Sequence, residues 1–157
     1  MKINLKIIKC DQEHINIIAD LIIALFKDFN EKSGGNFIVD RSSILSTTSL
    51  LIDRENFGCY IAFDNENPIG LITISHCSAI YNGGDFGVIT ELYVDKDKRS
   101  FGIGKLLLEK AYEFAKDNNW TKLEVGAPNK TDWPRTIDFY TENGFEEKGP
   151  KLRKKIE

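Results

Sequence analysis

A short glycine-bearing segment, RSFGIG from Arg99 to Gly104, carries the clearest chemical signal in the sequence. It separates an alternating strand pattern from an amphipathic helix pattern, so it lies where a helix begins. The first N–H groups of a helix have no partner within the helix, and the helix dipole makes this end positive. Gly102 and Gly104 would let a ligand approach the backbone, which predicts a phosphate or pyrophosphate site. A tight turn that serves only close packing is the alternative.

The segment matches neither the P-loop nor the complete dinucleotide fingerprint, because it lacks GK[ST] and the third glycine of GxGxxG. Its flanking elements are nevertheless clear. Leu92 and Val94 alternate with Glu91 and Tyr93, which predicts a half-buried strand. A helix is expected over 102–117, because apolar residues recur there at helical spacing: Ile103, Leu106, Leu107, Ala111, Phe114 and Ala115.

The periodicity of the whole chain predicts an α/β or α+β fold with a mixed central sheet and about four helices. A strand–helix–strand unit implies a parallel strand pair with a right-handed crossover. A polar loop is expected at 30–36, and Asp11 is expected to cap the first helix. The predicted helices are 15–29, 40–53, 102–117 and 134–143. The predicted strands are 3–8, 57–63, 69–78, 86–94, 121–127 and a last pair between 145 and 156.

The composition fits one domain over residues 1–157, since the chain is 41% hydrophobic and 29% charged. Its formal net charge of −3 and pI near 5.5 argue against a general nucleic-acid binder, which normally presents a strongly basic face. The short basic run from Lys148 to Lys155 is interpreted as a solvated strand, with a polyanion site as the alternative.

No apolar stretch is long enough to span a membrane, and no signal peptide pattern begins the chain, so a cytoplasmic location is expected. The three cysteines, Cys10, Cys59 and Cys77, are scattered and lack CxxC spacing. They are expected to be reduced thiols, and the sequence suggests neither a disulfide framework nor a metal site.

The spacing Arg99-x-x-Gly102-x-Gly104 after a strand resembles the [RQ]-x-x-G-x-[GA] motif of the GNAT superfamily of N-acetyltransferases. A second match follows in the expected order. Asn129 and the segment RTIDFYTENGF at 135–145 resemble the part of the family pattern in which an asparagine precedes a helix that ends in "FY…GF". The two matches together span 87–145.

The resemblance implies a GNAT-like domain whose central sheet is mostly antiparallel, with one parallel strand pair that splays apart. Acetyl-CoA would lie in that gap, between 92–94 and 125–127, with its pyrophosphate on the helix start. The cofactor-binding residues that this implies are Leu92, Tyr93, Val94, Arg99, Ser100, Phe101, Gly102, Ile103, Gly104, Lys105, Asn129 and Tyr140. The Arg99 side chain need not touch the cofactor.

Acetyl transfer to an amine needs a held cofactor, a deprotonated amine, an oxyanion donor and a proton for the departing thiolate. Glu91 matches a position where many family members carry a catalytic glutamate, which would act as a general base directly or through water. A backbone N–H near Leu92 or Tyr93 would stabilise the oxyanion. Tyr140 matches the tyrosine that often protonates the thiolate, and Phe139 is expected to take the core position. A solvated Glu91 and a Tyr140 that only packs are the alternatives.

The function that follows from the resemblance is direct transfer of an acetyl group from acetyl-CoA to a small amine, without a metal. An aminoglycoside, a polyamine, an amino acid derivative and a protein amine remain open as acceptors. Five acidic residues could attract a cationic acceptor: Asp28, Glu31, Asp85, Glu91 and Asp132. A noncatalytic acyl-CoA-binding module and transfer of a longer acyl group are the alternative functions. Family members often dimerise, so a homodimer is left open.

Overall fold

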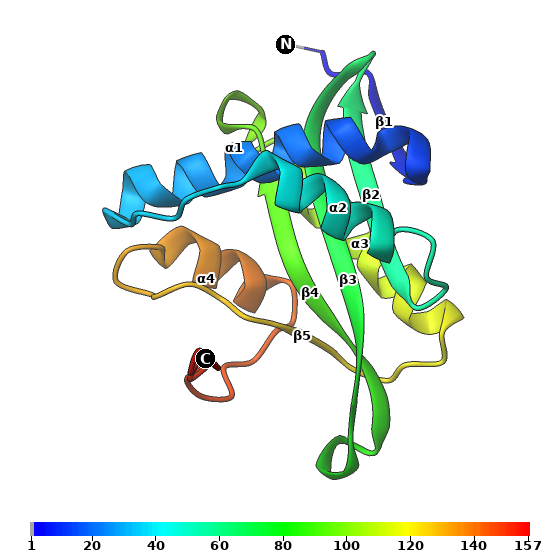
Figure 1. The fold of residues 1–157 in the computed structure, drawn as a ribbon, viewed down its shortest axis with the longest axis vertical. Coiled ribbons are helices and arrows are strands. Elements are labelled where there is room, and N and C mark those ends of the chain that lie inside the picture. Colours follow the sequence, from blue (N-terminus) through cyan, green and yellow to red (C-terminus); the bar gives the residue numbers. More distant parts are fainter. Residues whose placement is uncertain (1) are drawn as a thin grey trace.

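A five-stranded sheet with helices on both faces forms the structure, a computed structural model that describes residues 2–157 (Figure 1). Helices α1 and α2 cover one face, and α3 covers the other. The α-helices are α1 (Ile15–Ser33), α2 (Arg41–Leu51), α3 (Ile103–Asp117) and α4 (Pro134–Glu142). The strands are β1 (Leu5–Lys9), β2 (Phe57–Asp64), β3 (Asn67–Ala79), β4 (Gly84–Val94) and β5 (Leu123–Val125).

The strands lie in the order β1-β2-β3-β4-β5, and only the last pair, β4 and β5, is parallel. Helix α3 connects the two parallel strands, as a crossover must. The prediction of a mixed, mostly antiparallel sheet with one parallel pair is therefore confirmed.

A β-bulge interrupts β4 at Thr90. Thr73 of β3 pairs with Glu91, but the next residue, Ile74, pairs with Ile89, so Thr90 is an extra residue on β4. The parallel pairing of β4 with β5 also ends at this point, with Ile89 opposite Val125. Beyond the bulge, the carboxyl end of β4 continues without a β5 partner among residues 2–157. The predicted separation of the two strands begins here.

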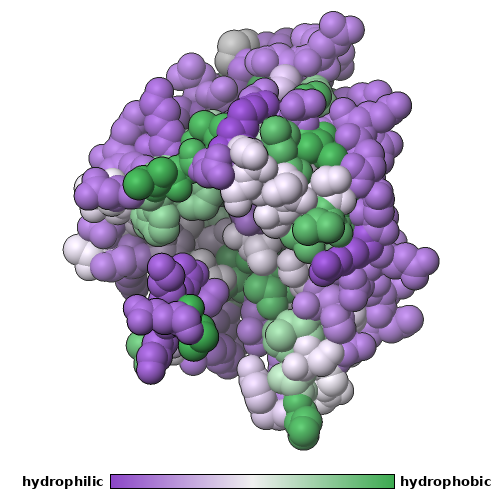
Figure 2. Space-filling model, in the orientation of Figure 1, coloured by the Kyte–Doolittle hydropathy of each residue, from purple (hydrophilic) through white to green (hydrophobic). Residues whose placement is uncertain are grey.

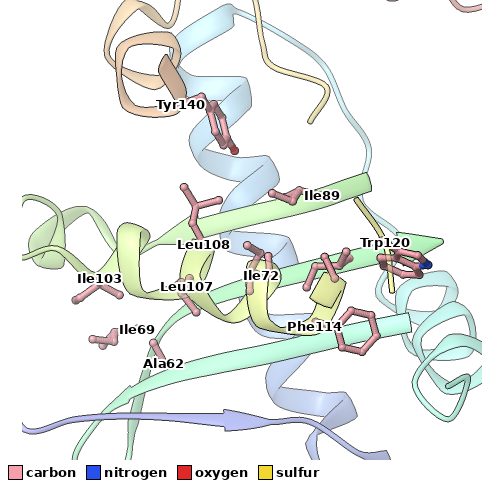
Figure 3. Packing of buried hydrophobic residues seen from close by; sticks show 13 residues of the cluster. Ala62, Ile69, Ile72, Ile89, Ile103, Leu107, Leu108, Phe114, Trp120 and Tyr140 are labelled. Carbon is pink, nitrogen blue, oxygen red and sulfur yellow. The ribbon is translucent and has the colours of Figure 1, made fainter. Parts of the chain in front are cut away.

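Two hydrophobic clusters hold the helices to the sheet. The cluster under α3 includes Ile72, Ile89, Leu107 and Phe114, whose side chains meet between α3 and the strands in Figure 3. The cluster under α1 and α2 has members from β2, β3 and β4, among them Tyr93. Tyr93 thus faces α1, whereas Leu92 and Val94 pack against the α3 cluster, which confirms the predicted alternation.

Three sequence predictions about the elements are wrong. Residues 145–157 form no strand, because β5 is only three residues long and offers little edge for pairing. The expected loop at 30–36 begins later, since α1 continues to Ser33 and ends at Gly34 with a φ of 66°. Leu106 is 37% exposed, and Leu108 is buried in its place because it points to the sheet. Asp11 caps a short 3₁₀ turn, Gln12–His14, directly before α1.

The neighbouring leucines of α3 provide a test of this packing. Leu107 is fully buried, so Leu107→Ala should lower the free energy of unfolding by about 2–5 kcal/mol. Leu106→Ala removes the same atoms from a partly exposed position and should cost less than about 1 kcal/mol. Urea denaturation of both variants measures the difference. Equal losses would contradict the assignment of Leu107 to the core.

Candidate functional site

The junction between β4 and α3 is built from turn residues with unusual backbone angles. The 3₁₀ turn Lys96–Lys98 follows β4, and the Asp95 side chain caps it. Ser100 and Gly102 then adopt positive φ angles of 71° and 79°, and Gly102 becomes the N-cap of α3. No side chain within residues 2–157 caps this helix end. The first N–H groups of α3 therefore have no side-chain partner there.

The two glycines of the junction are needed for different reasons. Gly102 has a positive φ, and no heavy atom lies within 4 Å of the position that a Cβ would take there, so the space beside it is open. Gly104 lies against α4, because a Cβ on it would come within 3.1 Å of the Phe139 ring. Gly104 therefore holds the beginning of α3 close to α4, while Gly102 leaves room for a ligand.

The Arg99 side chain is directed into the protein. Its Nε donates to the Val94 carbonyl at 2.8 Å, and one Nη donates to the buried Asp28 carboxylate of α1 at 2.6 Å. Lys96 Nζ lies 3.1 Å from the other Asp28 oxygen. Burial opposes the ionised form of Asp28, but hydrogen bonds from Arg99 and Lys96 outweigh it and hold its pKa below the usual value. The Arg99 side chain thus joins the junction to α1.

Glu91 lies directly after the bulge and is bound by two threonines. The Thr90 hydroxyl donates to Oε2 of Glu91 at 2.7 Å, and the Thr73 hydroxyl donates to the same oxygen. The Glu91 backbone N–H in turn donates to Thr73 Oγ1 at 3.0 Å. These hydrogen bonds fix the carboxylate on the α1 and α2 face of the sheet.

A cavity of about 270 Å³ opens beside Glu91 on this face. The cavity lies between α1, α2 and the sheet, and Figure 2 shows apolar and weakly polar side chains gathered on the face that carries these two helices. The apolar lining residues are Ile18, Ile22, Phe26, Ile44, Leu51 and Phe57. The hydroxyl-bearing lining residues are Ser43, Thr47, Thr48, Thr73, Ser75 and Thr90, and Cys59 and Glu91 complete the wall.

Tyr140 lies in the cluster on the α3 side and is 7% exposed. Figure 3 shows its ring directed from α4 toward the strand that carries Ile89. The ring packs edge-on against Phe139 and Phe145, at centroid distances of 5.3 and 5.4 Å. Burial raises the pKa of Tyr140 to about 12, so its hydroxyl keeps its proton at neutral pH. The expectation that Phe139 would be the more buried of the pair is wrong, because Phe139 lies over Gly104 and is only partly buried.

The other predicted cofactor contacts lie at the beginning of α3 and in the loop after β5. Ile103 is buried, whereas Ser100, Phe101 and Lys105 are exposed around the beginning of α3. Asn129 is exposed in the loop after β5, where its Oδ1 accepts a hydrogen bond from the Thr131 N–H at 2.8 Å.

Sequence reasoning missed the two threonines and the cavity wall. Thr73 meets Glu91 only because β3 and β4 pair in one particular register. Thr90 precedes Glu91 in the sequence, but only the bulge turns both side chains toward the same cavity. The apolar spacing of α1 and α2 indicated core faces and gave no sign that Phe26 or Ile44 would line a cavity.

The sequence of this chain also matches a known protein family. The family model described as "Acetyltransferase (GNAT) family" matches residues 22–145. The chain belongs to this family. The resemblance stated from the motifs at 99–104 and 129–145 is therefore confirmed, and the match extends into α1, where no motif was seen.

One relative is an uncharacterized N-acetyltransferase of Methanocaldococcus jannaschii, which is 36% identical over 102 residues. These residues make up 62% of this chain but only 43% of the relative. The match therefore spans less than half of the relative's length.

Solved structures share the fold at low sequence identity. An aminoglycoside acetyltransferase from an uncultured soil metagenomic sample, solved in complex with trehalose, has a TM-score of 0.76 at 22% identity, covering 98% of this chain and 97% of that chain. A predicted acetyltransferase of Clostridium acetobutylicum, solved with acetyl-CoA, has a TM-score of 0.79 at 19% identity, covering 96% of each chain.

Two further properties concern residues 2–157. None of the helices there is both long and apolar enough to cross a membrane. In the same residues, no group of three His, Cys, Asp or Glu side chains is arranged to hold a metal ion. The three cysteines are free thiols, with Cys10 and Cys59 buried and Cys77 exposed.

The Asp28 interaction should be visible in stability measurements. Asp28→Asn should lower the free energy of unfolding by about 1–3 kcal/mol at neutral pH, because Arg99 and Lys96 lose a buried carboxylate. The folded pKa lies below the ordinary value of 3.8, so this contribution is present above that value and is lost as pH falls through the folded pKa. Urea denaturation from pH about 7 to about 3 measures the difference between wild type and variant.

The matched control is Asp20→Asn on the same helix, which removes an exposed partner of Arg41 and should cost less than about 1 kcal/mol. The Asp28 difference should be constant well above pH 3.8 and smaller below it. A difference that stays the same at acidic pH would contradict this account of Asp28.

Proposed function

We propose that this protein is an N-acetyltransferase that moves an acetyl group from acetyl-CoA to the primary amine of a small molecule, by direct transfer in a ternary complex. One observation carries the proposal. The bulge at Thr90 ends the pairing of β4 with β5 and turns Glu91 into a cavity, while the same strand leads into the uncapped N-terminus of α3. A candidate base and a candidate anion site therefore flank one gap.

The residues at this gap fit acetyl-CoA. The open space beside Gly102 and the available N–H groups of α3 suit a pyrophosphate. In this proposal the backbone at 92–94 and 125–127 binds the pantetheine arm, and Asn129 bonds its amide. Ser100, Phe101, Ile103, Gly104 and Lys105 complete the wall around the phosphates. Arg99 contributes its backbone, since its side chain binds Asp28 and Val94.

In this proposal, side chains and backbone N–H groups of the protein carry out the proton transfers and stabilise the developing charge. When bound, acetyl-CoA supplies the thioester carbonyl carbon that the amine attacks. Glu91 accepts the proton of the acceptor ammonium, directly or through a water, and a backbone N–H near Leu92 or Tyr93 binds the oxyanion. Tyr140, whose raised pKa keeps its hydroxyl protonated, donates a proton to the departing thiolate and regains one from the second proton that the acetylated nitrogen loses. Glu91 and Tyr140 belong to opposite faces of the sheet, so acceptor and cofactor would meet in the gap from opposite sides.

Related proteins support this proposal. The similar metagenomic protein, an aminoglycoside acetyltransferase, was solved with sisomicin as well. The similar structure from Clostridium acetobutylicum was solved with acetyl-CoA. Each of these chains shares the fold with this protein at less than 25% identity.

The proposal is tested by thiol release from acetyl-CoA with a panel of amines and a control without amine. Saturable release that requires an amine is the expected result. Calorimetry with acetyl-CoA accompanies the assay. Binding without transfer to any amine would favour a noncatalytic acyl-CoA-binding module, and the absence of both would overturn the cofactor assignment.

Glu91→Gln should lower kcat by about 100-fold or more at neutral pH, because a general base typically contributes this much. The affinity for acetyl-CoA, measured by calorimetry, should change little, since Gln keeps the shape of the side chain. The control is Glu109→Gln, an exposed change on α3 that should leave kcat unaltered. An unchanged kcat for Glu91→Gln across pH would remove Glu91 from the mechanism.

Tyr140→Phe should lower kcat by about 100-fold while the protein stays folded, because the ring contacts with Phe139 and Phe145 remain. Tyr112→Phe, at an exposed position of α3, is the matched control. Stopped-flow thiol release and thermal unfolding separate a chemical effect from a structural one. Full activity of Tyr140→Phe with normal acetyl-CoA affinity would assign the proton to water.

A further inference from the structure

The charge of the cavity beside Glu91 identifies the class of acceptor more closely than the fold does. Fourteen described residues line this cavity, and Glu91 is the one acidic residue among them; no Lys, Arg or His belongs to this lining. The hydrogen bond with Cys10 and burial raise the pKa of the Cys59 thiol well above its usual range, so Cys59 adds no negative charge. The wall therefore offers a single carboxylate, six hydroxyl groups and six apolar side chains.

Three acidic side chains of α1 are already paired with cations of the protein. Asp28 and Glu31 bind Lys96, and Asp28 also binds Arg99. Asp20 is paired with Arg41 at 2.5 Å. These carboxylates are therefore neutralised by the protein's own cations and are not part of the cavity wall.

The apolar wall continues outward from the cavity. A second hollow, of about 210 Å³, shares Phe26, Ser43 and Ile44 with the first and is otherwise lined by 37–40. Its one charged residue, Asp40, is the N-cap of α2 and accepts a hydrogen bond from the Ser42 N–H at 3.1 Å. Ile38 is almost fully exposed at the rim. The second hollow is thus lined mainly by apolar side chains. Its one carboxylate, that of Asp40, caps the N-terminus of α2.

We infer that the acceptor is a primary amine with one positive charge and an apolar, hydrocarbon or aromatic body. This inference rests on the proposed function, because it concerns the acceptor of the same reaction. Glu91 would bind the single ammonium and then take its proton, while Phe26, Ile44 and Phe57 contact the body of the molecule. Within the cavity beside Glu91, a second ammonium would lie against hydroxyl and apolar groups without a second carboxylate, which disfavours polyamines and aminoglycosides.

Steady-state assays with purified protein and acetyl-CoA test the inference. The monoamines are phenethylamine and isoamylamine, and the polycations are putrescine, spermidine and kanamycin. Peptides with a free N-terminal amine or a lysine form a third group. The monoamines should show kcat/KM values at least about tenfold above those of the other groups. Higher values for the polycations or the peptides would overturn the inference and leave the proposed function intact.

A designed carboxylate sharpens the test. Thr47 and Ser46 are neighbouring exposed residues of α2, but only Thr47 lines the cavity. Thr47→Glu should shift the ratio of kcat/KM for putrescine over isoamylamine at least about tenfold toward the diamine. Ser46→Glu adds the same charge to the same helix and should leave the ratio unchanged. Equal shifts in both variants, or a shift in neither, would contradict this role of the cavity.

Binding of the amines without acetyl-CoA separates the two proposals. Calorimetry should detect phenethylamine binding to the wild-type protein, weaker binding of spermidine, and loss of phenethylamine binding in Glu91→Gln. If these results hold but no amine releases thiol, the proposed function fails and the cavity assignment stands. If no amine binds and none releases thiol, both are overturned.

Discussion

The bulge at Thr90 is the constraint on which the candidate site depends. Side chains of a regular strand alternate, so Glu91 would share the face of Ile89 if β4 had no extra residue. Ile89 packs in the cluster under α3, yet Glu91 lines the cavity on the opposite face, because Thr90 shifts the alternation by one residue. The same irregularity coincides with the last paired residue of β5. One inserted residue therefore redirects a carboxylate and opens the sheet beside it.

The opened sheet needs support from its surroundings, and two contacts supply it. Asp28 joins α1 to the junction after β4 through Arg99 and Lys96, which fixes the turn that leads into α3. Gly104 lets the beginning of α3 approach Phe139 of α4. The helices on either side of the gap are therefore held by one buried ionic interaction and one close apolar contact, while the gap itself stays unpaired. A binding gap of this kind requires a rigid frame, because its own backbone contributes little to stability.

The charge distribution follows from the same arrangement. Asp28 and Glu31 could have attracted a cationic acceptor, but they neutralise cations of the junction instead. The cavity is left with Glu91, bound by Thr73 and Thr90. The structural ion pairs and the proposed acceptor site thus use different carboxylates, and this division underlies the inferred preference for an amine with a single charge.

The sequence by itself determined the order of the elements, the glycine-bearing junction and the family, because turn chemistry, helical spacing and the motif at 99–104 are local properties. The tertiary structure alone decided which side chains meet. The partners of Arg99 and Glu91 come from segments distant in sequence or depend on strand register, as with Asp28 and Thr73. It also decided that 145–157 forms no strand, since pairing depends on an available edge and not on alternation alone.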